Sequence, residues 1–166
     1  MIARVFPRIT TATPSNNYIF YDVPGMFLPP ITEVHISVVF TYDLQRDEQL
    51  AKAWEHIAPV KIGGPALNEP GGEFHPGMYL KHGITITSRG CPNKCWFCSV
   101  WKREKGLREL EIKDGYMIFD DNLLACSESH IRAVFAMLKR QKERPIFTGG
   151  WRLKYSNCGI ATCCEK

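Results

Sequence analysis

The stretch GITITSRGCPNKCWFC, residues 83–98, joins a strand pattern to a loop rich in cysteine. After its glycine the stretch opens with apolar and β-branched residues, a pattern typical of a strand. Gly90, Pro92 and Asn93 then supply the residue types that allow the backbone to turn sharply. The stretch therefore predicts a strand that leads directly into a tight, cysteine-bearing loop.

The cysteines of this loop indicate a metal site rather than a disulfide framework. Cys91, Cys95 and Cys98 are three of the seven cysteines in the chain, and no further cysteine follows until Cys126. The first residues lack the apolar core of a signal peptide, so we expect a cytoplasmic protein with reduced thiols. In that compartment a tight cysteine cluster is typical of metal binding.

The composition is that of an ordinary globular chain. It has 166 residues, of which 45% are apolar and 23% are charged. This length suits one domain, or one domain with an appendage. No apolar run of about 18 residues occurs, so no membrane span is expected. The net charge of +4 permits nucleic acid as a partner without requiring it.

The first half of the sequence predicts an arm, a β-α-β piece and a linker. Residues 1–30 contain five prolines and little periodicity, so we expect an extended arm. Residues 31–64 predict two strands joined by a helix, an arrangement that favours a parallel strand pair. Asp47 is expected to cap this helix, which should run to about Ile57. Residues 65–82 are rich in proline and glycine and predict a linker or a long loop.

The second half, residues 83–150, alternates strands with a loop or a helix. Strands are expected within residues 83–87, 116–122 and 144–150, and Ser127 is expected to cap the helix before the last strand. In parallel α/β folds, functional residues gather at the carboxyl ends of strands. The three strand ends carry the cysteine loop, Asp120-Asp121-Asn122 and Thr148-Gly149-Gly150.

The last residues, 151–166, show neither helical nor strand periodicity and predict an irregular tail. The tail holds Cys158, Cys163 and Cys164. A second metal site there is a weaker hypothesis, because the segment has no pattern that would fix the three thiols.

The spacing of the loop cysteines leaves several metal sites open. Structural zinc prefers four protein ligands, and His75 or His82 is a candidate for the fourth. Ferredoxin loops use tighter C-x2-C-x2-C runs with a further cysteine. The C-x3-C-x2-C spacing instead fits a four-iron cluster in which one iron lacks a protein ligand.

The loop resembles the signature of the radical S-adenosylmethionine superfamily, C-x3-C-x-aromatic-C. Cys91, Cys95 and Cys98 match its cysteines, and Phe97 matches the aromatic residue before the last of them. The resemblance implies a 4Fe-4S cluster on the three cysteines, with S-adenosylmethionine on the open iron. It also implies an external electron donor and reductive cleavage to a 5'-deoxyadenosyl radical, with a substrate that the sequence does not name.

The same resemblance implies a fold and further contacts. The fold would be α/β: a partial (β/α) barrel of about three β/α units, preceded by a small Rossmann-like β-α-β piece. Phe97 would pack near the adenine. The superfamily contacts the S-adenosylmethionine amino group at the end of the second strand, where this chain has Asp120, Asp121 and Asn122. Gly149 and Gly150 would let a ligand approach the backbone closely.

A second class of function stays open from the sequence. The resemblance covers about residues 83–150, whereas a complete barrel needs on the order of 200 residues. The alternative is a non-catalytic module that binds zinc, a defective cluster or nucleic acid. The short barrel and a run of basic residues after the first cysteine motivate this alternative, although a solvated face is the favoured explanation of the basic residues. The run consists of Lys94, Lys102, Arg103, Lys105 and Arg108.

Overall fold

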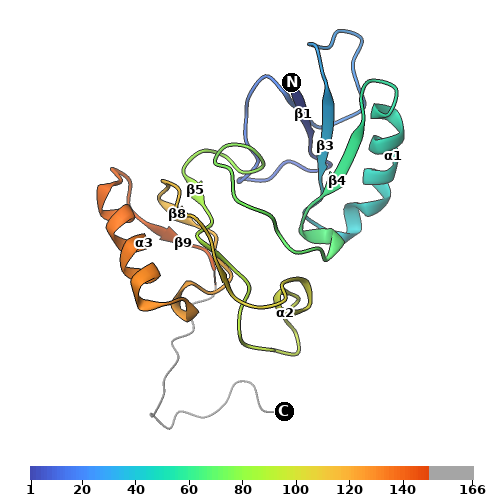
Figure 1. Ribbon diagram of the computed structural model, residues 1–166. Coiled ribbons are helices and arrows are strands. Elements are labelled where there is room, and N and C mark those ends of the chain that lie inside the picture. Colours follow the sequence, from blue (N-terminus) through green and yellow to red (C-terminus); the bar gives the residue numbers. More distant parts are fainter. Residues whose placement is uncertain (150–166) are drawn as a thin grey trace. The chain divides into compact units, whose positions relative to one another are not determined.

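The computed structural model describes residues 1–149, which fall into two compact units (Figure 1). The N-terminal unit comprises residues 1–71 and 77–82, and the cysteine unit comprises residues 72–76 and the chain from residue 83 onward. The elements of the N-terminal unit are β1 (Ile2–Val5), β2 (Ile19–Phe20), β3 (Glu33–Ser37), η1 (Thr41–Asp43), α1 (Leu44–Trp54), β4 (Val60–Gly63) and η2 (Pro65–Leu67). Those of the cysteine unit are β5 (Ile84–Thr85), β6 (Ser88–Arg89), α2 (Val100–Arg103), β7 (Arg108–Glu109), β8 (Met117–Ile118), η3 (Leu123–Ala125), α3 (Glu128–Arg140) and β9 (Ile146–Phe147).

The N-terminal unit is built on a parallel sheet with the strand order β2-β1-β3-β4. The neighbouring parallel strands β3 and β4, with α1 between them in the chain, confirm the predicted β-α-β piece. Residues 1–30, expected as an extended arm, instead contribute β1 and β2. The sheet includes β1 because Ala3 and Val5 are fully buried in its core. A strand of only four residues leaves too short a pattern to be recognised from the sequence.

Helix α1 covers one face of this sheet (Figure 1) and begins earlier than predicted. Asp47 lies inside the helix rather than at its cap, on the same buried face as Leu50 and Trp54. The Trp54 indole Nε1 donates a hydrogen bond to the carbonyl oxygen of Asp22 at 3.0 Å. The spacing of Asp47 and Leu50, three residues apart, explains why the carboxylate turns inward.

Asp47 makes the stability of the N-terminal unit depend on pH. Its side chain is 3% exposed, and within residues 1–149 its Oδ1 accepts no hydrogen bond. Burial, and secondarily the charge of Glu48, raises the pKa of Asp47 from 3.8 to about 6. As pH rises between these values, the unfolded chain releases a proton that the folded chain retains, so stability falls through this window.

We therefore expect Asp47→Asn to stabilise the N-terminal unit at neutral pH. The gain should be about 2 kcal/mol near pH 7.5 and should vanish near pH 4, where Asp47 is protonated in the folded state. Urea unfolding at the two pH values measures this difference, with the exposed Glu48→Gln as a control of smaller effect. An equal gain at both pH values would contradict the assignment.

The cysteine unit contains a second parallel sheet, with the order β5-β8-β9 and α3 along one face (Figure 1). Each predicted strand is present, although only two residues of each enter the ladder. Ser127 caps α3 as predicted, because its side chain accepts a hydrogen bond from the His130 amide. The α3 face that packs on Ile118 of β8 includes Val134, Met137 and Leu138.

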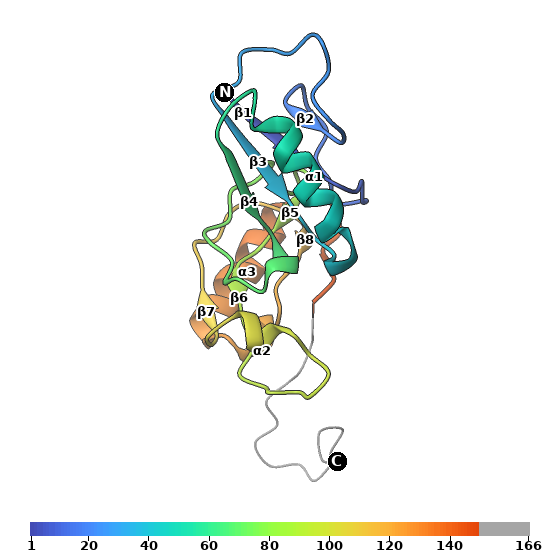
Figure 2. The same ribbon diagram turned by 90° about the vertical axis from the view of Figure 1, so that its right-hand side faces the viewer.

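The cysteine loop belongs to an excursion from this sheet. Strands β6 and β7 pair antiparallel and close the base of the excursion, which carries the short helix α2 (Figure 2). The described residues thus form a mixed α/β fold with parallel sheets, which confirms the predicted α/β class. No helix among residues 1–149 is both long and apolar enough to cross a membrane.

Candidate metal centre

The loop between β6 and α2 holds Cys91, Cys95 and Cys98 at partly exposed positions. None of these cysteines forms a disulfide within the described chain, nor does Cys126, which is buried in the core beneath α3. The Cys98 amide donates to the carbonyl oxygen of Cys95 at 3.0 Å. The Trp101 indole donates to the same oxygen at 2.8 Å. These bonds fold the last two loop cysteines into one tight turn.

Gly90 starts the loop in a backbone conformation that favours glycine. Its φ is +86°, and a Cβ at this position would overlap the carbonyl oxygen of Gly106. The two ends of the excursion therefore approach each other closely only because residue 90 lacks a side chain. This geometry explains the glycine in front of the first cysteine.

Asp120, the first residue of the Asp-Asp-Asn motif after β8, holds the chain that enters the loop. Its carboxylate accepts hydrogen bonds from the Thr87 amide at 2.6 Å and from the Thr87 hydroxyl at 2.6 Å. The Ser88 hydroxyl donates to it at 2.9 Å. All three residues are buried, so these bonds fix the segment between β5 and β6.

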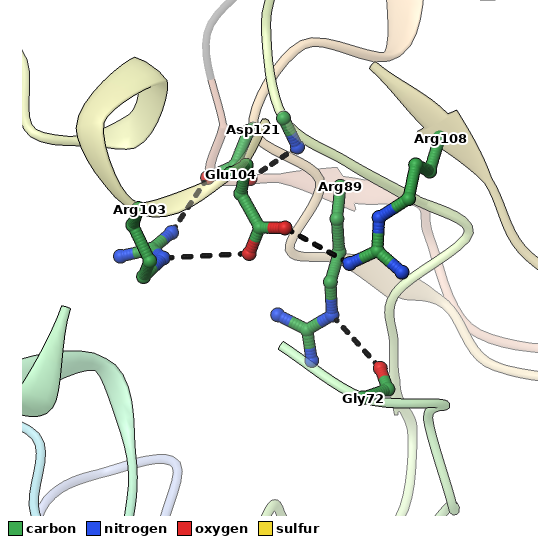
Figure 3. Close-up of polar contacts among 7 residues, drawn as sticks. Gly72, Arg89, Arg103, Glu104, Arg108 and Asp121 are labelled. Carbon is green, nitrogen blue, oxygen red and sulfur yellow. Dashed lines mark hydrogen bonds and ion pairs between the residues drawn. The ribbon is translucent and has the colours of Figure 1, made fainter. Parts of the chain in front are cut away.

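The next two residues of the motif contact the loop itself. Asp121 accepts from the Gly90 amide at 2.8 Å and from the Arg103 guanidinium at 3.4 Å (Figure 3). The Asn122 Nδ2 donates to the Cys91 Sγ at 3.3 Å. The Asn122 Oδ1 is buried and accepts no hydrogen bond from residues 1–149. The structure thus places this motif directly beside the cysteines.

The motif contacts differ from the contacts expected from sequence. All three residues were expected to face the amino group of S-adenosylmethionine, whereas Asp120 and Asp121 already use both carboxylate oxygens to hold the protein chain. The Asn122 Oδ1 is the motif oxygen that these bonds leave available. The sequence offered no signal for this division, because the partners lie 18 to 33 positions away.

Part of the basic run is neutralised by a buried carboxylate. This carboxylate was not predicted from the sequence. Glu104 is 2% exposed and pairs with Arg103 at 3.4 Å and Arg108 at 2.9 Å (Figure 3). Arg89 donates to the Gly72 carbonyl at 3.3 Å, and burial lowers the pKa of its guanidinium. The signal available in the sequence was that Glu104 is the one acidic residue among positions 90–108.

The lysines of that run remain at the surface. Lys94, Lys102 and Lys105 are exposed, and Lys102 lies over the Trp101 ring at 5.6 Å from its centroid. Phe97 is 68% exposed and packs edge-on against Trp96, which is 75% exposed. Phe97 is therefore no core residue of the described chain, and its contact with adenine stays a prediction.

Gly149 contacts protein backbone at its predicted strand end. A Cβ there would overlap the carbonyl oxygen of Asp120, so glycine lets the end of β9 approach the end of β8. The Thr148 amide donates to Ile118 of β8 at 3.1 Å just before it. Gly150 and the three tail cysteines, Cys158, Cys163 and Cys164, lie outside the described residues.

The part of the chain that the structure describes contains no group of three or more His, Cys, Asp or Glu side chains arranged to hold a metal ion. The chain matches no protein-family model, and searches of curated proteins and of solved structures also found no match.

Proposed function

We propose that the chain is a radical S-adenosylmethionine protein that binds a 4Fe-4S cluster through Cys91, Cys95 and Cys98. The observation that carries the proposal is the position of the cysteine signature, on a tight loop after β5 of a parallel sheet. The end of the neighbouring strand β8 supports it, because Asn122 donates to the sulfur of Cys91.

The residues of the loop fit such a cluster in donor type and accessibility. The three thiols are partly exposed, and thiolates are the ligands that iron–sulfur clusters use. Cys126 is a poor candidate for a fourth ligand, because burial raises the pKa of its thiol and its side chain packs in the core. The proposal therefore assigns three protein ligands and leaves one iron for S-adenosylmethionine.

The protein would supply position and enclosure. When bound, the cluster and S-adenosylmethionine supply the reductive cleavage that gives a 5'-deoxyadenosyl radical, with the electron coming from an external donor. The buried Asn122 Oδ1 is an acceptor suited to the ammonium group of S-adenosylmethionine. Phe97 offers an exposed ring for the adenine. Asp120 and Asp121 keep the loop in place through their bonds to Ser88 and Gly90.

The proposed fold is a partial (β/α) barrel in the cysteine unit. Strands β5, β8 and β9, with α3 between the last two, would be its first units, about three in number. The β3-α1-β4 piece of the N-terminal unit would be the Rossmann-like element that precedes it.

Metal analysis after anaerobic reconstitution with iron and sulfide tests the proposal. We expect about four iron and about four sulfide per chain. About one zinc without sulfide would contradict it and would favour the alternative of a zinc module. A nucleic-acid-binding module is the other form of the alternative. It is less well supported, because Arg103 and Arg108 already pair with Glu104.

A further inference from the structure

Asn122 is a buried side chain whose two amide atoms have different surroundings. The residue is 2% exposed, and its Nδ2 donates to the Cys91 Sγ at 3.3 Å. Its Oδ1, by contrast, has no hydrogen-bond partner among residues 1–149. The amide N–H groups of Asn122 thus donate to a cysteine sulfur, which indicates that the residue acts through that sulfur.

The chemistry of the sulfur fixes which end of the amide faces it. A cluster-bound thiolate has no proton, so it accepts hydrogen bonds and cannot donate them. The Asn122 Oδ1 would repel it, whereas Nδ2 stabilises it. The orientation found here, with Nδ2 toward Sγ, is therefore the one that suits a thiolate at Cys91.

The chain on either side of the Asn122–Cys91 contact is joined by a second hydrogen bond. Asp121, its neighbour in the chain, accepts from the amide of Gly90, which is the neighbour of Cys91. The two parallel contacts, Asp121 to Gly90 and Asn122 to Cys91, fix the end of β8 against the start of the loop. Asn122 is therefore kept beside Cys91 by a contact in addition to its own.

We propose that Asn122 is a positioning residue that raises the reduction potential of the cluster through Cys91, an inference that rests on the proposed function. Reduction adds negative charge to the cluster and its sulfurs, so an N–H donor stabilises the reduced form more than the oxidised form. Asn122 itself is 2% exposed, so its amide is shielded from water, whereas the Cys91 sulfur is partly exposed. Asn122 thus eases electron transfer from the external donor.

The test compares the reconstituted wild-type chain with Asn122→Leu in a redox titration followed by EPR. Leucine has nearly the same size and lacks the donor. At one fixed potential, we expect the ratio of reduced to oxidised cluster to fall about tenfold. That fall corresponds to a decrease of about 59 mV for a one-electron couple.

A matched control removes a part-buried hydrogen bond of β5, a strand of the same sheet, that does not involve the cysteine loop. Thr85→Val deletes the hydroxyl that donates to the Lys113 carbonyl, and it should leave the potential unchanged. Asn122→Gln keeps the amide and should restore part of the potential. An unchanged or higher potential in Asn122→Leu, with iron and sulfide retained, would overturn the inference.

A second readout needs no change at Asn122 and stays informative if Asn122→Leu fails to hold iron. Asparagine labelled with ¹⁵N at the side-chain amide alone should show a weak nitrogen coupling to the reduced cluster in pulsed EPR. The coupling should persist in Asn93→Ala, which removes the asparagine of the cysteine loop itself. Absence of the coupling in a wild-type chain that holds the cluster would overturn the inference and leave the proposed function standing. Absence of iron from the wild-type chain would instead overturn the proposed function.

Discussion

Replacing Cys91, Cys95 or Cys98 with alanine is expected to reduce the iron content of the reconstituted chain from about four atoms to a small fraction of that value. Each thiolate would bind a different iron, so two remaining ligands cannot hold the cluster against loss to solvent. The loop is partly exposed, which leaves a cluster with a missing ligand open to water. Iron and sulfide assays on each variant, together with the visible absorption of the cluster, measure the loss.

Cys126→Ala is the matched control for these variants. It also removes one thiol from the cysteine unit, but this thiol is buried in the core beneath α3. We expect full iron content and a stability loss of about 1 kcal/mol. A loop variant that keeps its iron would show that its cysteine is no ligand and would contradict the three-cysteine assignment.

Asp120→Ala is expected to destabilise the cysteine unit by about 3–5 kcal/mol. The change removes the acceptor of three hydrogen bonds, of 2.6, 2.6 and 2.9 Å, and leaves the donors of Thr87 and Ser88 buried without it. Urea unfolding monitored by fluorescence measures the loss, and the cluster should become labile because the chain entering the loop is released.

Two variants separate the lost bonds from the lost charge at Asp120. Asp120→Asn keeps the shape and one carbonyl oxygen, and the hydroxyls of Thr87 and Ser88 can rotate to accept from its amide, so we expect a loss of only about 1 kcal/mol. Asp114→Ala removes an exposed carboxylate of the same unit and should change stability little. Equal losses for Asp120→Ala and Asp114→Ala would refute the structural role of Asp120.

The parts of the fold that the sequence predicted are those with local signals. The Ser127 cap and the α3 periodicity are read within one helix, and the strand at 83–87 is read from adjacent residues. Strand β1 escaped prediction because its four residues become a strand only by pairing with β2 and β3. The burial of Asp47 was not predicted, because its polarity favours a helix cap, whereas its position within α1 turns it toward the core.

In the candidate site, too, the features that could be predicted are those with a signal in the local sequence or the strand order. Spacing along the chain was enough to select Cys91, Cys95 and Cys98, because all three lie on one loop. Strand topology was enough to bring Asp120, Asp121 and Asn122 near that loop. The specific partners, such as the sulfur of Cys91 for Asn122, depend on side-chain geometry across two strands and are not encoded in local pattern. The burial of Glu104 between arginines depends equally on tertiary structure.

The most direct test of the central claim is the EPR spectrum of the reduced, reconstituted chain with and without S-adenosylmethionine. If one iron lacks a protein ligand, chelation by the amino acid end of S-adenosylmethionine changes the g values of the cluster. The account predicts this change for the wild-type chain. An iron–sulfur spectrum that S-adenosylmethionine leaves unaltered would contradict the claim that Cys91, Cys95 and Cys98 leave a coordination position for it.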